Sequence, residues 1–305
     1  MDLDLLGQTA ALFTSCLWTF SSILFTEAGR KIGSISVNAH RIVLAVVFLC
    51  VAHAALLGSI LPVASEAQWL WIGMSGIIGL GVGDFALFAA FVIIGPRRSV
   101  LIMALSPIFA SVVAFLMLGE TISYLGIVGI AITLTGVAWV MLEREKKKTE
   151  NPISSKLEIL GVLFALIGAA GQGIGLVLAK KGIYYETGTI LNPLSATLMR
   201  MLCGALFVWT FILIAGKIGE TRRALRNKKG IKYVAGGAFI GPFLGVTLSM
   251  VAVVHTQAGI AQTLMSIMPI FIIPVVWVLY KQRTSLRGMF GAIIAVIGVA
   301  ILFLV

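Results

Sequence analysis

Ten long apolar runs recur along the chain, and they constrain its fold more than any other feature. Each run is roughly 20 residues long, enough for an α-helix to cross about 30 Å of hydrocarbon. None shows the period-two alternation of a barrel strand, so we expect helices. Only 11% of the residues are charged, whereas an average soluble domain has about 25%. The sequence therefore predicts an all-α integral membrane protein with ten transmembrane helices. The runs lie near residues 5–26, 35–57, 69–94, 99–118, 124–142, 158–179, 190–215, 232–254, 259–279 and 287–305.

The runs fall into two groups of five. We expect a first unit at 1–142, a charged linker at 143–157 and a second unit at 158–305. Because each group holds an odd number of spans, the second unit enters the membrane upside down relative to the first. Inverted repeats of this kind are the usual plan of secondary transporters, which bind their solute near the midplane between the halves.

The later part of each unit carries a recognisable internal repeat. When the first unit slides by 162 positions, the PIF at 107–109 falls on the PIF at 269–271. Residues 83–142 then match residues 245–304 at 16 of 60 positions, including a series of ordered glycines. The earlier spans match with a different offset. We therefore predict that the two units are copies of one five-helix fold.

This pattern resembles the EamA-like family of the drug/metabolite transporter superfamily. The strongest likeness is SPIFASVVAFLMLGETISYLGIVGIAITLTGVAWV at 106–140, in which a proline, a GE pair and spaced glycines follow one another. The second copy departs from this pattern, because Lys281-Gln282 replaces Gly119-Glu120. The resemblance covers nearly the whole chain. It implies two five-helix repeats and solute transport, and it leaves the solute open because members of such families carry very different solutes.

The positive charges predict an orientation. Of the 23 lysines and arginines, all but four lie in the loops that follow the odd-numbered runs; Lys180 and Lys181 lie on the opposite side, and Arg41 and Arg200 lie inside runs. The positive-inside rule then places the linker at 143–157 in the cytoplasm and both termini outside. Relatives with this plan are often drawn with both termini inside, so the resemblance and the charges give different expectations here.

One carboxylate interrupts the third run. In GVGDFALFAAF, Asp84 is the only formal charge between residues 69 and 95. A charge at a helix centre costs about 2.5–3.5 kcal/mol on insertion scales, so it faces a cavity or a partner. Two hypotheses follow: Asp84 contacts a cationic solute or a coupling proton, or it is a structural group bonded to hydroxyls, backbone or an arginine.

Four further residues are candidate binding groups. Arg41 and Arg200 occupy the same place in their repeats, where they either hold an anionic group of the solute or extend to a nearby interface. Trp18 and Gln172 are paired by the repeat, so we expect them to face each other across a central cavity. Gln172 lies in GAAGQGIG, which favours a helix face with little bulk rather than a nucleotide loop.

The sequence contains no HExxH, GxSxG or Walker lysine motif, so we expect no enzyme and no cofactor. The three cysteines lie in apolar runs without metal or disulfide spacing. The basic residues follow membrane topology, which argues against a nucleic-acid partner. We predict a secondary transporter in a bacterial or archaeal type of plasma membrane. It would carry a small polar or amphipathic metabolite, such as an amino acid, with export as the expected direction and a proton as a candidate coupling ion. The alternative is a non-transporting membrane receptor or a lipid-binding scaffold.

Overall fold

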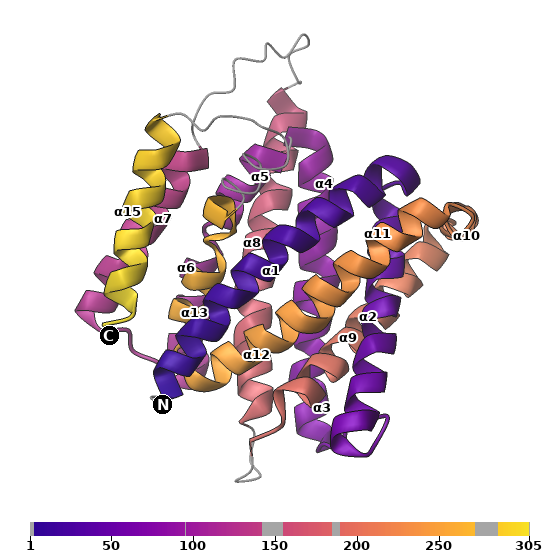
Figure 1. The fold of residues 1–305 in the computed structure, drawn as a ribbon, viewed down its shortest axis with the longest axis horizontal. Coiled ribbons are helices and arrows are strands. Elements are labelled where there is room, and N and C mark those ends of the chain that lie inside the picture. The colour runs from indigo at the N-terminus through magenta and orange to yellow at the C-terminus, as the bar shows by residue number, and fades with distance from the viewer. Residues whose placement is uncertain (1–2, 95, 142–154, 185–189, 272–285, 305) are drawn as a thin grey trace.

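The computed structural model describes residues 3–94, 96–141, 155–184, 190–271 and 286–304, and the regular secondary structure of these residues is helical (Figure 1). Two of the helical segments, named η1 and η2, have the wider π-helical winding. The elements are α1 Leu3–Ile32, α2 Ser34–Leu57, α3 Glu66–Ser75, η1 Gly76–Gly83, α4 Asp84–Ile94, α5 Pro96–Met103, α6 Ser106–Leu118, α7 Tyr124–Met141, α8 Ser155–Ile183, α9 Pro193–Ile214, α10 Ile218–Ala224, α11 Lys228–Ala238, η2 Phe239–Gly245, α12 Val246–His255, α13 Ala258–Met265 and α15 Leu286–Leu302.

Seven helices in the described part of the chain are long and apolar enough to cross a membrane. They correspond to seven of the ten predicted runs, and the protein is accordingly a multi-pass membrane protein. The other three runs contain shorter apolar helices, and one of these runs continues beyond residue 271 into residues outside the described part. The count of ten spans therefore stays a prediction. The three shorter helices are Tyr124–Val140, Ala258–Phe271 and Gly288–Leu302.

The third and eighth runs share an unusual helix geometry. In each, an α-helix passes into a π-helical stretch and returns to α-helix, as α3–η1–α4 and as α11–η2–α12. Both π-helical stretches are rich in glycine, and η2 also contains Pro242. A proline inside a helix removes a hydrogen bond, and π-bulges occur often at functional sites. The backbone of both runs therefore departs from a regular α-helix near the middle of the bundle.

The predicted run at 99–118 is broken into α5 and α6. The turn at residues 104–105 precedes Pro107, which lies in the first turn of α6. A proline ring clashes with the preceding helical turn but is well tolerated at a helix start. A matching turn at 266–267 separates α13 from the segment that holds Pro269. The prolines thus interrupt the helices at equivalent places.

Helices α7 and α15 form a close pair at the left of Figure 1. Glycines on both helices allow this approach. A β-carbon at Gly136 would lie 2.3 Å from the backbone nitrogen of Ala295, and one at Gly298 would lie 2.4 Å from that of Thr133. Small residues at such contacts let membrane helices pack by van der Waals contact and close backbone approach.

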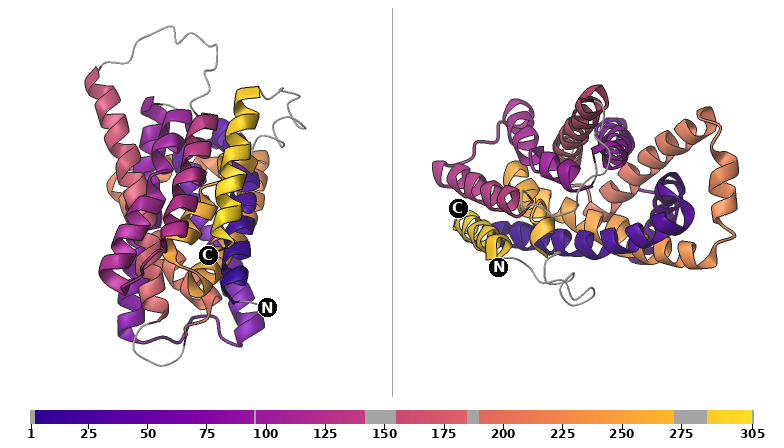
Figure 2. Two further views of the ribbon diagram at one scale, coloured as in Figure 1. Left: turned by 90° about the vertical axis from the view of Figure 1, so that its left-hand side faces the viewer. Right: turned by 90° about the horizontal axis from the view of Figure 1, so that it is seen from above.

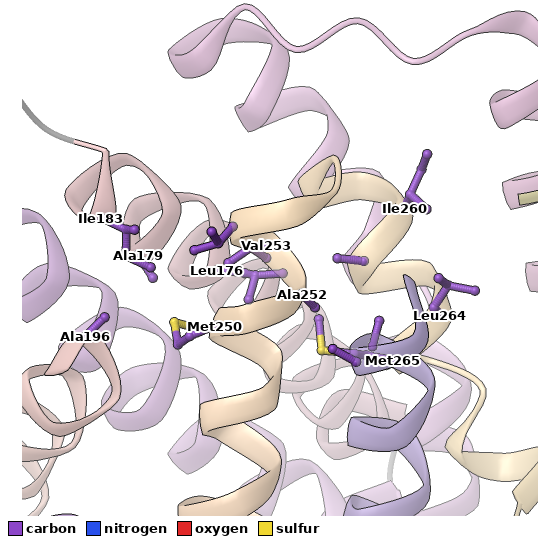
Figure 3. Packing of buried hydrophobic residues seen from close by; sticks show 14 of the residues in the cluster. Leu176, Ala179, Ile183, Ala196, Met250, Ala252, Val253, Ile260, Leu264 and Met265 are labelled. Carbon is purple, nitrogen blue, oxygen red and sulfur yellow. The ribbon is translucent and has the colours of Figure 1, made fainter. Parts of the chain in front are cut away.

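The two halves of the chain interlock rather than pack as separate bodies. Helix α1 packs along α11, η2 and α12, whereas α8 packs along α3, η1 and α4. The largest buried cluster accordingly draws on both halves. Figure 3 shows part of it, with Leu176 from α8, Met250 from α12 and Leu264 from α13, all of which are buried.

The start of α1 and the end of α15 lie at the opposite end of the bundle from the end of α7 and the start of α8 (Figure 1). The first two lie together at the lower left of Figure 1, whereas α7 ends and α8 begins at the top. Figure 2 shows the same arrangement from the side and from above, with α10 at one edge between α9 and α11. For the region of α10 the sequence predicted only a charged connection, because the seven residues of this helix are too few to show a periodic pattern.

Candidate functional site

Asp84 lies inside the bundle, where η1 ends and α4 begins. It is 6% exposed. It stands ten residues before the end of α4, so it lies about 15 Å along the helix from that end at 1.5 Å per residue. The sequence placed it at about 20 Å from either end, by counting forward from Trp69 and back from Arg97 at 1.5 Å per residue, whereas α4 ends at Ile94. The carboxylate is therefore in the interior, nearer to the α4–α5 end.

Both oxygens of Asp84 are engaged by side chains from other helices. Nη2 of Arg41, in α2, donates to Oδ2 in an ion pair. Nε2 of Gln172, in α8, donates to Oδ1 at 2.8 Å. Because α2 and α8 belong to different halves of the chain, Asp84 joins the two halves at this point.

Arg41 is held by more than its ion pair. Its Nε donates to Oδ1 of Asn38 at 2.8 Å, one helical turn earlier. The guanidinium lies 5.7 Å from the ring centre of Phe25 and 5.4 Å from that of Phe88. A guanidinium over aromatic faces is stabilised by the ring quadrupoles, and more strongly where water is excluded. Arg41 therefore has a fixed, largely dehydrated place beside Asp84.

Arg200 approaches the same region from α9. It is 3% exposed and interacts electrostatically with Asp84. A β-carbon at Gly79 would lie 2.7 Å from Nη2 of Arg200, so a glycine in η1 makes room for the guanidinium. The Nε atom of Arg200 is buried without a hydrogen-bond partner among the described residues. A buried donor without a partner is costly, which makes this atom a candidate contact for a bound anionic or carbonyl group.

The expectation that Trp18 and Gln172 face each other stays a prediction. Trp18 packs on η2, where a β-carbon at Gly245 would lie 2.8 Å from the indole Cδ1 and Nε1. Its ring contacts two of the buried hydrophobic clusters. Gln172 instead contacts Asp84 and, more weakly, the carbonyl of Gly79 at 3.5 Å. The structure therefore brings Asp84, Arg41, Arg200 and Gln172 together, whereas the described contacts of Trp18 are with η2 and the two clusters.

Three residues of the site, Asn38, Phe25 and Phe88, were not predicted from the sequence. Asn38 precedes Arg41 by three positions, a spacing that places both on one helix face and was available as a signal. Phe25 and Phe88 gave no signal, because aromatic residues are common in apolar runs. Their role depends on how α1, α2 and α4 pack.

A second buried ion pair joins the halves at the end where the termini lie. Nζ of Lys180 lies 2.5 Å from Oε1 of Glu120 and donates to the carbonyl of Thr256 at 2.7 Å. Oε2 of Glu120 accepts from the backbone N–H of Ala258 at 2.8 Å. Tyr184, just beyond α8, donates to the carbonyl of Val254, and burial together with Glu120 raises the pKa of its phenol. This cluster ties the α6–α7 turn to α8 and to the α12–α13 turn.

Two hollows lie at opposite ends of the bundle, and neither is lined by the residues around Asp84. One, of about 400 Å³, lies between the α2–α3 and α8–α9 connections and includes Gln68 and Ser195. The other, of about 1050 Å³, lies beside α10. Among the described residues, no three histidine, cysteine or carboxylate side chains gather in a way that would hold a metal ion.

Comparisons with known proteins agree on the kind of protein. The model of the EamA-like transporter family matches residues 5–142 and again residues 159–304. An uncharacterized transporter of Clostridium kluyveri is 21% identical over 228 residues, which span 75% of this chain and 70% of that protein. One crystal structure aligns with 97% of this chain and 96% of its own, with a TM-score of 0.74 and 15% identity. Similarity at that identity shows the fold alone.

A bundle of apolar helices that encloses an aspartate between arginines is typical of membrane transport proteins, in which intramembrane charges face the interior. The chain belongs to the EamA-like transporter family, within the drug/metabolite transporter superfamily, because the family model covers most of its length. The resemblance stated from the sequence is confirmed. The protein is a membrane transporter in general class, and its family is one of transporters rather than enzymes.

Proposed function

We propose that the protein is a secondary transporter that moves a small polar or amphipathic metabolite across the plasma membrane by alternating access. The observation that carries this proposal is the charged group between the halves, in which Asp84 contacts Arg41 and Gln172 beside Arg200. Such charges are expensive in a membrane and are kept where they contact solutes or ions. An amino acid or a related solute fits, because the site offers both a carboxylate and guanidinium groups.

We further propose ten spans in two inverted five-helix units, 1–142 and 158–305. Reciprocal hydrogen bonds support this symmetry. Ser75 of α3 donates to the carbonyl of Gly175 in α8, and Ser21 of α1 donates to that of Gly237 in α11. The offset of 162 pairs Ser75 with Gly237, and the offset of 154 that pairs Trp18 with Gln172 also pairs Ser21 with Gly175. The donor and the acceptor thus exchange helices between the two interfaces.

Other features support the same symmetry. Arg41 and Arg200 are each the eighth residue of their helices, α2 and α9, which pack on each other. The two π-helical stretches end at Gly83 and Gly245, which are 162 positions apart. The family model also matches twice, once in each half. An inverted pair of repeats would place the two arginines at similar depths from opposite faces.

In the proposed cycle, the solute competes for the contacts of Asp84. A cationic group would displace Arg41 from the carboxylate, and the released guanidinium would then bind an anionic group of the same solute. Protonation of Asp84 would break the ion pair in the same way, which gives a route to proton coupling. Each event changes contacts between α2, α4 and α8. It therefore alters the interface at which the two halves of the chain meet.

Solute movement in proteoliposomes tests the proposal directly. Uptake and efflux are measured against a panel of amino acids, nucleosides and amines, with and without a pH gradient. Asp84→Asn keeps the size and hydrogen bonding of the side chain but removes its charge, so we expect transport to fall by about tenfold or more, in keeping with the loss of a charged contact. The matched control is Glu220→Gln, which changes an exposed carboxylate in α10.

Normal transport by a well-folded Asp84→Asn protein would reject a role for Asp84 in the cycle and leave it as a structural group. The absence of transport for every solute, with saturable binding retained, would instead favour a receptor. The same proteoliposomes also indicate the direction of transport. Efflux that is faster than uptake, under solute gradients of equal size, identifies an exporter.

A further inference from the structure

The largest hollow described above lies far from Asp84 and has a distinct chemistry. It is formed by the α1–α2 junction, α10 and the start of α11, and its volume is about 1050 Å³. Figure 1 places α10 at the right-hand edge of the bundle, and the view from above in Figure 2 shows it bridging α9 and α11. The described residues that line it are Lys31, Ile32, Gly33, Gly219, Glu220, Arg223, Ala224, Arg226, Asn227, Lys228 and Lys229.

The lining is strongly cationic. It includes five lysine or arginine side chains but only one carboxylate, that of Glu220. Glu220 already has a partner outside the lining, because its Oε2 lies 3.5 Å from Nζ of Lys217. Within the described ranges of the chain, Arg223, Arg226 and Lys229 make no ion pair. The hollow therefore gathers positive charge that these parts of the protein leave unbalanced.

The surroundings of the hollow are apolar. Ile214 at the end of α9 is 83% exposed, Leu225 after α10 is 55% exposed, and Ile218 at the start of α10 is also exposed. Helix α9 is one of the candidate membrane spans, so we expect the exposed apolar side chains at its end to lie at the boundary of the membrane. A short segment with exposed apolar residues beside arginines is suited to the boundary between acyl chains and headgroups.

Basic loop residues whose only role is to set the orientation in the membrane need not line a common hollow. Arg222 and Lys232 belong to the same connecting region and are equally basic, yet neither lines the hollow. A selected subset of the basic residues therefore converges on one concave surface. Arginine is also the side chain that grips a phosphate with two parallel hydrogen bonds.

We propose that this hollow binds the phosphate of an anionic membrane lipid headgroup. Arg223 and Arg226 grip the phosphate, Lys31 and Lys229 add positive potential, and Ile214 and Leu225 contact the acyl chains. Anionic lipid attracts basic side chains at the membrane surface, and each such side chain contributes to binding. The site stands independently of the proposed transport cycle, since it shares no residue with the group around Asp84.

The test uses the full-length protein in neutral detergent with a fluorescent short-chain phosphatidylglycerol as the probe and phosphatidylcholine as the uncharged comparison. Arg223→Ala combined with Arg226→Ala removes two lining charges. Arg222→Ala combined with Lys232→Ala removes two charges outside the hollow and is the matched control. All four side chains are exposed, so thermal unfolding should be similar in both variants.

We expect phosphatidylglycerol affinity to fall by about tenfold or more in the first variant and by less than about twofold in the control. Phosphatidylcholine should bind weakly to all the proteins. Equal losses in the two variants would overturn the proposal, because they would indicate general attraction to loop charge. Complete displacement of the lipid probe by millimolar inorganic phosphate would overturn the lipid as the ligand and indicate a soluble phosphate. A lining variant that unfolds is replaced by Arg226→Gln, judged by the same tenfold criterion.

Discussion

Arg41 and Asp84 form an ion pair inside the bundle although they are 43 positions apart and lie on different helices. The pair is largely dehydrated, with side chains that are 15% and 9% exposed. A buried ion pair offsets the cost of desolvation only when additional hydrogen bonds satisfy its other polar atoms. Asn38 and Gln172 supply such bonds here, one to each member of the pair. The pair is thus supported by hydrogen bonds from the protein's own side chains.

The first prediction concerns the coupling between these two residues. Arg41→Gln and Asp84→Asn should each destabilise the protein by about 3 kcal/mol, since each leaves a buried charge without its partner. The double variant should be more stable than the sum of the single effects predicts, with a coupling energy of about 1–3 kcal/mol. Denaturant unfolding in a fixed detergent measures all four proteins. Strict additivity would mean that the two side chains do not interact in the folded protein.

A second prediction separates packing from function at two neighbouring glycines. A β-carbon at Gly76 would lie 2.2 Å from the backbone carbonyl oxygen of Arg200, whereas the close contact at Gly79 would be with the end of the Arg200 side chain. Gly76→Ala should therefore cost about 2 kcal/mol or more, because backbone must move. Gly79→Ala should cost less and mainly displace the guanidinium, so transport should fall more than stability. Thermal unfolding in detergent and transport in proteoliposomes measure the two effects.

Gly219→Ala is the control for this pair, because nothing lies within 4 Å of the added β-carbon and Ala is favoured over Gly in a helix. Its melting temperature should be unchanged or slightly raised. If Gly79→Ala and Gly76→Ala lower stability equally while transport per folded molecule is unchanged, Arg200 is a packing residue only.

The sequence predicted the parts of the structure that follow from the cost of burying polar groups in lipid. Long apolar runs must be helical, so most helix positions were predictable to within a few residues. A charge inside such a run must face the interior, so the location of Asp84 followed as well. The repeat pointed to Arg41 and Arg200 together, and both lie near Asp84.

The remaining features depend on how the helices pack against one another, which a single sequence does not reveal. The partner of Asp84 could not be named, because the direction in which Arg41 points depends on how α2 sits against α4. The π-helical stretches were missed, since one extra residue per turn barely changes an apolar pattern. The expectation that Trp18 faces Gln172 stays a prediction, because pairing two positions by sequence does not fix where either side chain points.

A third prediction concerns topology. Thr149, outside the described residues, belongs to the linker that the charges place in the cytoplasm. Thr149→Cys in a cysteine-free background should resist a membrane-impermeant thiol reagent in intact cells and react once the cells are opened. Val63→Cys is the opposite control, because Val63 is 91% exposed in the α2–α3 connection at the other end. Labelling of the Thr149→Cys protein in intact cells, with the Val63→Cys protein protected, would reverse the orientation.

The last prediction concerns the ion pair at the end of the bundle where the termini lie. Glu120 and Lys180 connect the two halves there, and both side chains are largely buried. If the halves move apart during transport, this contact must break in every cycle. Lys180→Met should then destabilise the closed end and leave Glu120 without its partner, at a cost of about 3 kcal/mol in stability. It should also increase the rate at which a cysteine placed near that end reacts with a thiol reagent.

The neighbouring residue provides the control for this experiment. Lys181 carries the same charge, but its Nζ lies 4.2 Å from the ring centre of Trp71 rather than beside a carboxylate. Lys181→Met should cost only about 1 kcal/mol, in keeping with a cation–π contact near a helix end. The reporter in both methionine variants is Thr256→Cys, because the Thr256 side chain is buried beside Lys180 and reacts faster only if this end opens. Equal reaction rates in the two variants would show that the Glu120–Lys180 pair does not hold this end closed, whereas a rise confined to Lys180→Met would identify it as a contact that opens during transport.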